Sequence, residues 1–302
     1  MEIVKVESLR RPSSFSTLTN VLLGFLLIGP LAGMGLASIF YTGDLMSDID
    51  SGKSNSTLAR AMMLTQGTIT FVGLILIPTI QVTVIERKPL EGFFPQRSLH
   101  PILLLLFSIA TMIFIVAISP ITEWNAAWKL PTMLSDFENW AIAAQERSVR
   151  VVSILTSQTS IAYVLGSSIV VALLPAIGEE FVFRGIIQNH LVSKYVNYHT
   201  AIWVTAAIFS VAHFQIYGLI PRLMFGAFFG YAYHWSKNLI YPIAMHFVNN
   251  ALILMLSYGT IVNSEKFSVD QLNSLSAGWV LLADISLVVI IYIASGIRAD
   301  RK

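Results

Sequence analysis

Two neighbouring glutamates stand inside an otherwise apolar stretch of the chain. Glu179 and Glu180 lie in the run 160–191, whose only other Asp, Glu, Lys or Arg side chain is Arg184. An ionisable side chain deep in a bilayer is costly, so it is usually paired and functional. Glu180 and Arg184 are four positions apart, so they share one face of a helix and can form an ion pair. Glu179 points about 100° away, so we expect it to meet a different neighbour and to be available for chemistry.

Two histidines lie in the apolar stretches that follow. His213 comes four residues after Phe209, and His246 comes four residues before Asn250. Glu179 and His213 stand equally far, seventeen residues, from position 196 in the turn between their helices. In a hairpin of two regular helices, equal offsets give equal depth because each residue adds the same rise. The sequence therefore predicts that Glu179 and His213 face each other inside the bundle.

These residue types suit the hydrolysis of a peptide bond, which needs a base for water and donors for the developing oxyanion. Glu179 with His213 can supply the base, and His246 with Asn250 can supply the donors. The same two histidines could instead ligate a divalent metal such as zinc, with the glutamate as ligand or base, as in a metalloendopeptidase. The residues leave both mechanisms open. They also leave open that the glutamate–arginine pair only holds two helices together.

Composition and hydropathy predict the helices that position these residues. The protein is 55% hydrophobic and 12% charged, whereas soluble domains are about 25% charged. A transmembrane helix needs about 20 apolar residues, and eight stretches meet or approach that length. We therefore expect an all-α, polytopic transmembrane helical bundle of about eight spans. The stretches are 18–41, 62–84, 101–120, 160–191, 200–217, 219–235, 239–259 and 277–296.

The segment 123–150 differs because it mixes tryptophans with charged side chains. Tryptophan favours the boundary between lipid and water, so we expect an amphipathic helix lying on the outer face of the membrane. A plain connecting loop is the alternative. We divide the chain into N-terminal spans with this interfacial segment, 1–150, and a catalytic transmembrane core with the last span, 151–302.

Charged residues indicate orientation and partners. With the N-terminus inside, eleven lysines and arginines lie in inner segments and six in outer segments. This bias predicts that both termini are cytoplasmic, in a bacterial inner membrane. The net charge is only +2 and no dense basic patch is present, which argues against a nucleic-acid partner. The expected partners are the lipid bilayer and a membrane-associated protein or peptide. The absence of cysteine excludes a cysteine nucleophile and thiolate metal sites.

Three short strings in one region resemble the motifs of a known family. They are Glu179-Glu180-x-x-x-Arg184, Phe209-x-x-x-His213 and His246-x-x-x-Asn250. In this order, and on hydrophobic stretches, they resemble the CPBP intramembrane proteases, also called the ABI family. That family includes type II CAAX prenyl endopeptidases and bacteriocin-processing or immunity-associated membrane proteins. The resemblance covers about Ile161 to Ser257.

The resemblance implies an intramembrane endopeptidase that hydrolyses a peptide bond of a membrane-associated protein or peptide, such as a prenylated CAAX-type protein. Glu179 would activate water with the help of His213. Glu180 and Arg184 would form a supporting pair. His246 with Asn250 would stabilise the oxyanion. The family is described both as glutamic peptidases and as metal-dependent enzymes.

Two other functional classes stay open. A non-catalytic membrane scaffold or a bacteriocin-immunity-type protein could carry the same motifs. A proton-coupled transporter would also place carboxylates and histidines in the membrane, but the sequence has no paired broken helices or internal repeat of the transporter kind. Arg222, near the outer end of the sixth stretch, is expected to snorkel or to pair with a neighbour rather than to catalyse.

Overall fold

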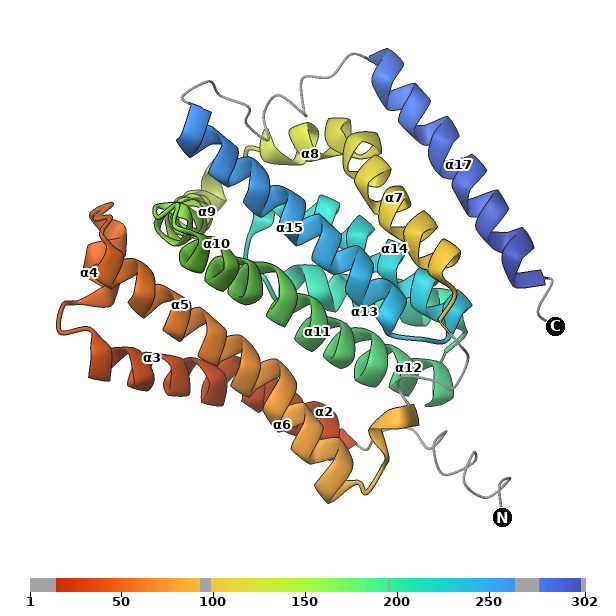
Figure 1. Ribbon diagram of the computed structural model, residues 1–302, viewed down its shortest axis with the longest axis horizontal. Coiled ribbons are helices and arrows are strands. Elements are labelled where there is room, and N and C mark those ends of the chain that lie inside the picture. The colour runs from red at the N-terminus through yellow and green to blue at the C-terminus, as the bar shows by residue number, and fades with distance from the viewer. Residues whose placement is uncertain (1–14, 93–98, 195, 264–276, 300–302) are drawn as a thin grey trace.

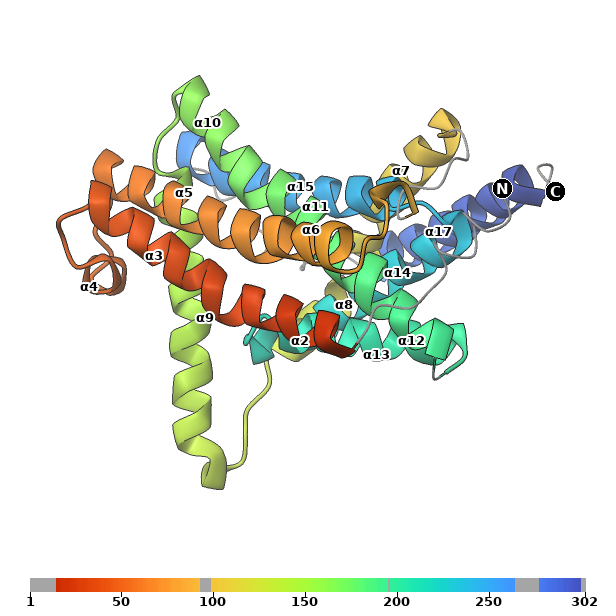
Figure 2. The ribbon, with the colours of Figure 1, turned by 90° about the horizontal axis from the view of Figure 1, so that it is seen from below.

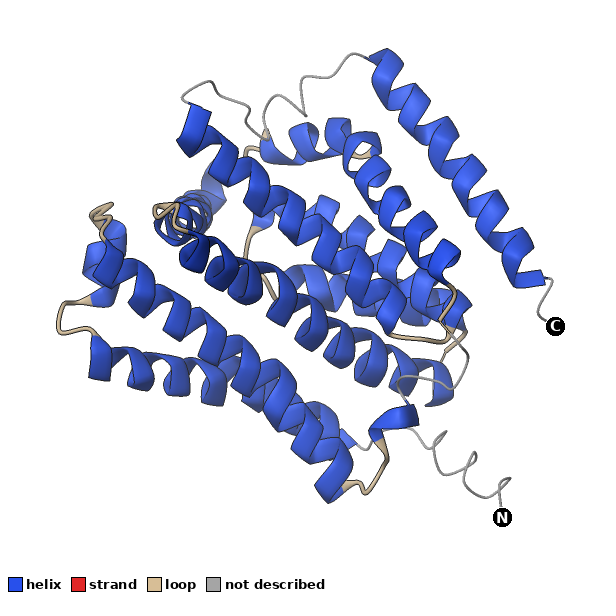
Figure 3. Ribbon diagram, viewed as in Figure 1, coloured by secondary structure: helices blue, strands red, loops and turns tan. Residues whose placement is uncertain are grey.

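The described part of the chain consists of helices and the loops between them (Figure 3). The structure, a computed structural model, describes residues 15–92, 99–194, 196–263 and 277–299. Within these ranges no residue belongs to a strand. The predicted all-α class is confirmed.

Two long helices form an N-terminal hairpin and lie side by side in Figure 1. Gly29 and Gly33 allow their close packing, because a Cβ atom on either would lie 2.7–2.8 Å from atoms of the facing helix. The first helix runs through α2 (Phe15–Leu23), η1 (Gly24–Ile28) and α3 (Gly29–Phe40). After α4 (Leu45–Asp50), the second runs through α5 (Ser56–Thr70), η2 (Phe71–Leu76), α6 (Ile77–Ile80) and η3 (Gln81–Ile85), and η4 (Leu90–Gly92) follows.

The remaining helices pack beside this hairpin, with the last one at the edge of the bundle (Figure 1). The next elements are α7 (Pro101–Ala117), α8 (Ser119–Ala126), η5 (Thr132–Leu134) and α9 (Ser135–Thr156). One long helix then runs through α10 (Ile161–Ser167), η6 (Ser168–Leu173), α11 (Leu174–Glu180), η7 (Phe181–Gln188) and α12 (Asn189–Lys194). It is followed by α13 (Tyr198–Val211), η8 (Ile216–Gly218), α14 (Leu219–Ser236), α15 (Ile240–Asn263) and α17 (Ala277–Ala299).

Each of the eight predicted stretches contains a helix, but eight spans are not confirmed. Five helices of the described chain are long and apolar enough to cross a membrane. A sixth is added if α7 and α8, which meet at a bend of 46°, count as one span. The five are Ser16–Phe40, Ser56–Ile85, Ile161–Val192, Ile240–Tyr258 and Ala277–Ala294. The chain is an integral membrane protein.

The fifth predicted span, 200–217, is wrong at its C-terminal end. Helix α13 stops at Val211 and has 14 residues, which at about 1.5 Å per residue reach about 21 Å. The hydrocarbon core of a bilayer is about 30 Å thick, so α13 alone does not cross it. The turn that leads to α14 therefore lies within the bundle and not beyond its end.

The long helix from α10 to α12 runs through the centre of the bundle. Its α11 and η7 parts contact α5, η2, α13, α14 and α15. The apolar side chains around it form a buried cluster that includes Phe181, Val182, Phe183, Ile186 and Phe209. Because both glutamates lie on α11, this packing fixes their positions.

Helix α9 crosses the long helices instead of running along them. Figure 1 shows it end-on, and Figure 2 shows it projecting from the layer that the long helices form. This orientation suits a helix that lies along a membrane surface, as expected for 123–150, but the helix itself begins at Ser135 and continues to Thr156. Arg147 ties α9 to α4 through two hydrogen bonds of 2.8–2.9 Å to Asp50. The exposed rings of Phe137 and Trp140 stack with their centroids 5.4 Å apart.

Candidate active site

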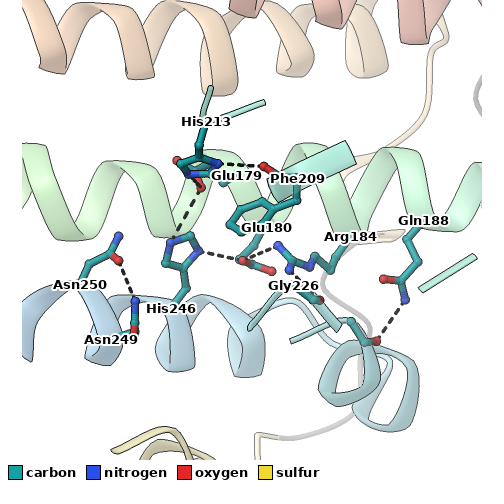
Figure 4. A network of polar contacts seen from close by, with 11 residues as sticks. Glu179, Glu180, Arg184, Gln188, Phe209, His213, Gly226, His246, Asn249 and Asn250 are labelled. Carbon is teal, nitrogen blue, oxygen red and sulfur yellow. Dashed lines mark hydrogen bonds and ion pairs between the residues drawn. The ribbon is translucent and has the colours of Figure 1, made fainter. Parts of the chain in front are cut away.

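Glu180, Arg184 and His246 form a buried polar network at the centre of the bundle (Figure 4). Arg184 Nη1 donates to Glu180 Oε1 at 2.7 Å, and neither side chain is exposed. His246 Nδ1 lies 2.8 Å from the same carboxylate oxygen. The predicted pairing of Glu180 with Arg184 is confirmed. A carboxylate at Nδ1 also fixes the orientation of the imidazole and directs its Nε2 atom elsewhere.

Glu179 points away from Arg184 and toward the rings of His213 and His246 (Figure 4). Its Oε2 atom lies 3.9 Å from His213 Nε2 and 3.8 Å from His246 Nε2. These distances are too long for direct hydrogen bonds and leave room for a bridging water. Glu179 Oε2 is buried and has no hydrogen-bond partner among the described residues. The structure thus brings Glu179, His213 and His246 around one space, and the expected facing of Glu179 and His213 agrees with this geometry.

His213 lies in the turn after α13, whereas the sequence placed it inside a helix. Its Nδ1 atom is 2.8 Å from the backbone oxygen of Phe209, and the Phe209 ring packs edge-on against it with centroids 4.9 Å apart. Because a carbonyl only accepts, Nδ1 carries the proton of the neutral ring and Nε2 keeps a lone pair toward Glu179. The next residue, Phe214, has a φ of 53°, an uncommon conformation outside glycine that belongs to the turn into α14.

Asn250 stands one helical turn after His246 on α15. Its Nδ2 atom donates to the backbone oxygen of Val171 at 3.4 Å, and its Oδ1 atom accepts from Asn249 Nδ2 at 3.1 Å. The hydrogen bonds of Asn250 therefore go to its neighbours and not to the glutamates. A bond of 3.4 Å is long, so the Asn250 amide can turn toward a ligand at small cost.

The described residues contain no group of three or more His, Asp or Glu side chains placed to hold a metal ion. The distances of 3.8–3.9 Å from Glu179 to the two histidines exceed the separation of about 3.3 Å between ligands around tetrahedral zinc. The described residues therefore show no assembled zinc site at the predicted ligands His213 and His246. No step of the reaction proposed below passes through a metal, and the metal requirement stays a prediction for measurement.

Comparison with known proteins found one family that is similar to this region. Residues 161–252 match the family described as type II CAAX prenyl endopeptidase Rce1-like. We refer to these residues as the Rce1-like segment. The matched residues include all three motifs found in the sequence, so the resemblance stated there is confirmed for this part of the chain.

Two bacterial proteins are similar to part of the chain. The uncharacterized protein YpbD of Bacillus subtilis (strain 168) is 29% identical over 90 residues, which are 28% of this chain and 42% of that protein. The membrane-embedded CAAX protease MroQ of Staphylococcus aureus (strain USA300) is 29% identical over 102 residues, which are 32% of this chain and 40% of that protein. The chain thus spans about two fifths of the length of the curated relatives it matches. No solved structure matches.

Two glycines of the Rce1-like segment complete the buried network, and the sequence analysis missed them. The backbone oxygen of Gly226 accepts from Arg184 Nη2 at 2.9 Å, and that of Gly230 accepts from Gln188 Nε2 at 3.1 Å. A Cβ atom on Gly226 would lie 2.9 Å from the Cβ of Ala206, so glycine allows α13 and α14 to approach. The G-x-x-x-G spacing, a known signal of close helix packing in membranes, could have found both.

Aromatic rings enclose the polar groups of the Rce1-like segment. The guanidinium carbon of Arg184 lies 4.9 Å from the ring centroid of Phe209 and 5.6 Å from that of Phe229. The Phe229 ring also stacks on His246, with centroids 5.4 Å apart. Rings in this position stabilise a cation through their negative faces. Sequence spacing contains no signal for Phe229, because the contact joins different helices.

Asn125 lies outside the Rce1-like segment and fixes the turn that carries His213. Its Nδ2 atom donates to the backbone oxygen of Ile216 at 3.0 Å, and its Oδ1 atom accepts from the backbone N–H of Ile220 at 2.9 Å. Asn125 is fully buried. Irregular backbone is tolerated within a membrane only where its polar groups are satisfied. Asn125 therefore helps a non-helical turn to exist inside the bundle.

Proposed function

We propose that the chain is an integral membrane endopeptidase that hydrolyses a peptide bond of a membrane-associated protein or peptide. The observation that carries the proposal is the convergence of Glu179 Oε2 with the Nε2 atoms of His213 and His246, at 3.9 and 3.8 Å. The Rce1-like match and the similarity to a protein named a CAAX protease support it. A prenylated CAAX-type protein is the substrate class that the family description names, and it is the first to assay.

In the proposed reaction, Glu179 and His213 hold one water molecule between them. The Nε2 lone pair of His213 accepts one hydrogen bond from this water and orients it. Glu179 takes the other proton as the water oxygen attacks the carbonyl carbon of the substrate. The protonated Glu179 then gives its proton to the amide nitrogen as the C–N bond breaks, which releases an amine and a carboxylic acid and restores the base.

His246 and Asn250 are the proposed donors to the oxyanion. Glu180 accepts from His246 Nδ1, so a His246 that is protonated on both nitrogens donates through Nε2 into the site. Asn250 supplies a second donor when its amide turns away from Val171. Donors fixed in place before the reaction stabilise the charge that develops on the oxygen.

The decisive variant is Glu179→Gln, which keeps the size of the side chain and removes the base. We expect the cleavage rate to fall by about 10²–10⁴-fold, the usual contribution of a general base. Product peptides are measured by mass spectrometry, first in membranes from cells with either protein and then with purified protein. Glu146→Gln is the matched control, because this glutamate is 61% exposed on α9 and, within the described part of the chain, pairs only with Arg150; it should keep wild-type activity.

Retained cleavage by purified Glu179→Gln protein would contradict the assignment. If this variant loses no biological effect in cells, the chain is a non-catalytic scaffold or an immunity-type protein. Ion-dependent flux in liposomes would instead identify a transporter.

We also propose that both termini are cytoplasmic and that the membrane is a bacterial inner membrane. The support is the bias of eleven inner against six outer basic residues. A phosphatase reporter that works only outside the cytoplasm should be inactive when fused to the C-terminus. Activity of that fusion would reverse the orientation.

A further inference from the structure

Arg222 is a cation beside the candidate active site whose hydrogen-bond partner is a neutral residue. It is half-buried in the first turn of α14. Its Nη1 atom donates to the backbone oxygen of Gln215 at 3.0 Å, and its Nη2 atom donates to the side-chain oxygen of the same residue. The guanidinium packs against Gly218, where a Cβ atom would lie 2.7–2.9 Å from it. In the described part of the chain, no carboxylate forms an ion pair with Arg222 within 4.0 Å.

Arg222 therefore has no contacting counter-charge among the described residues. A charge inside a membrane bundle is normally matched by an opposite charge. The N-terminus of α14 adds the positive end of a helix dipole at the same place. Gln215, which accepts from Arg222, stands two residues after His213, and Glu179 Oε2 lies 3.8–3.9 Å from the two histidines without forming an ion pair with Arg222. The cation therefore packs against the turn that carries His213, and no described carboxylate contacts it.

Holding the turn does not require a charged side chain. Asn125, which is neutral, satisfies the backbone of Ile216 and Ile220, and the Ser210 hydroxyl donates to the backbone oxygen of Leu219 at 2.5 Å. A neutral donor could serve Gln215 in the same way, and a guanidinium is far more costly to bury. We therefore expect the charge of Arg222 to have a function other than holding this turn.

We propose that Arg222, positioned by Gln215, binds a carboxylate of the substrate and so selects the peptide bond that is cleaved. The inference rests on the proposed endopeptidase function. A guanidinium has five N–H donors; two donate to Gln215, and the others can form a forked pair with a carboxylate. The carboxylate has two sources, the C-terminus of a chain cut near its end or an Asp or Glu side chain close to the cleaved bond.

The test uses three pools of peptides that carry an N-terminal palmitoyl anchor. The first has randomised sequences without Asp or Glu and ends in a free carboxylate. The second has the same sequences and ends in a carboxamide. The third ends in a carboxamide and contains one Glu at varied positions. Purified full-length protein in liposomes cleaves each pool, and mass spectrometry quantifies the products. We expect the wild-type protein to prefer a carboxylate-containing pool over the second pool by about 10–100-fold in kcat/KM, the range for charge-assisted hydrogen bonds.

Two variants and one control show whether the preference depends on Arg222. Arg222→Gln should reduce the ratio between the preferred and the second pool to about one, mainly through KM, because a carboxylate is bound alike before and during reaction. Gln215→Glu keeps the arginine but gives it an internal carboxylate, so it should reduce the ratio as well. Arg60→Gln removes an arginine of α5 that donates to the neutral Tyr163 hydroxyl at 2.9 Å, and it should keep the wild-type ratio.

The outcomes separate the inference from the function on which it rests. Preference for the first pool assigns the C-terminal carboxylate, and preference for the third assigns a side chain. Equal cleavage of all pools by the wild-type protein, or an unchanged ratio in both site variants, leaves the peptidase in place and overturns the role of Arg222. The wild-type protein could also cleave none of the three pools and none of the proteins in cell membranes. In that case the endopeptidase function is wrong, and so is the role of Arg222.

Discussion

At the scale of single residues, the two adjacent glutamates have opposite surroundings. Glu180 is fully buried and shares one oxygen between Arg184 and His246, at 2.7 and 2.8 Å. Glu179 is 17% exposed, and its Oε2 atom lies 3.9 Å from His213 Nε2, a separation that a bridging water can span. Glu180 is held by two partners and stabilises the structure, whereas Glu179 faces the Nε2 atoms of two histidines and is available to take a proton.

This difference predicts that two glutamine variants fail in different ways. Glu180→Gln leaves the Arg184 guanidinium buried without its counter-charge, so the free energy of unfolding should fall by about 3–5 kcal/mol. Glu179→Gln should leave the free energy of unfolding near the wild-type value and abolish cleavage. Thermal and denaturant unfolding of the purified proteins in detergent measure the free energy of unfolding. Equal losses of stability in the two variants would contradict the assigned roles.

The proposed reaction also predicts how activity responds to metal removal. Glu179 acts on water directly in that reaction, so cleavage should persist after treatment with a strong chelator. Elemental analysis of the active protein is the companion measurement. Loss of activity on chelation that zinc alone restores would replace this mechanism with a metal-dependent one, with His213 and His246 as the ligands to examine first.

The sequence was a good guide to contacts within one helix and a poor guide to contacts between helices. The Glu180–Arg184 pair follows from a spacing of four residues, and the meeting of Glu179 with His213 follows from depth in a hairpin. The sequence grouped His246 with Asn250, but the structure binds His246 to Glu180. That contact joins α11 to α15, and helix periodicity contains no information about which faces of two helices meet.

At the scale of elements, the packing of α13 against α14 depends on glycine. Gly226→Ala would place a Cβ 2.9 Å from the Cβ of Ala206, so the helices must separate and the bond from Arg184 to the Gly226 oxygen must lengthen. We expect the free energy of unfolding to fall by about 1–3 kcal/mol, as for overpacked cores. Gly35→Ala on α3 is the control, because its Cβ would meet nothing within 4 Å. An unchanged unfolding temperature in Gly226→Ala would contradict the close approach.

The early end of α13 was the element that sequence analysis placed wrongly. Apolar residues such as Phe214 and Ile216 continue past Val211, so hydropathy does not mark the end of the helix. The end is stabilised from a distant part of the chain, where Asn125 satisfies the backbone of the turn. Contacts between distant parts of the chain, and not the local sequence, determine where α13 ends. Among the residues of the turn, only Gly218 indicates locally that the helix stops.

The contact between α4 and α9 predicts a response to acid. Hydrogen bonds from Arg147 hold the pKa of Asp50 below its ordinary value. Because the folded pKa is lowered, this contact stabilises the protein above the ordinary pKa of about 3.9 and is lost as pH falls through the folded pKa. Hydrogen exchange in α9 should therefore accelerate below about pH 4. Asp50→Asn should show the faster exchange already at neutral pH, and identical exchange in the two proteins would contradict the prediction.

At the scale of the whole molecule, hydropathy located the long apolar helices of the described chain but not how many of them cross the bilayer. The expected boundary at residue 150 stays a prediction, and the two parts pack tightly against each other. A Cβ on Gly178, next to Glu179, would lie 2.7 Å from the Cβ of Leu74 on η2. The N-terminal hairpin therefore supports the helix that carries both glutamates, although it contains none of the three motifs.

The short helix α13 has a consequence for the surrounding lipid. A bilayer thins around a membrane protein whose apolar height is less than its own thickness, and α13 reaches only about 21 Å before the chain turns at Ala212. Local thinning beside α13 would draw headgroups and water toward His213 and Glu179. A scissile bond at the membrane boundary can meet the base without being pulled to the middle of a full-thickness bilayer. In the proposed reaction, deformation of the lipid would then do part of the work of exposing that bond, in place of unfolding of the substrate.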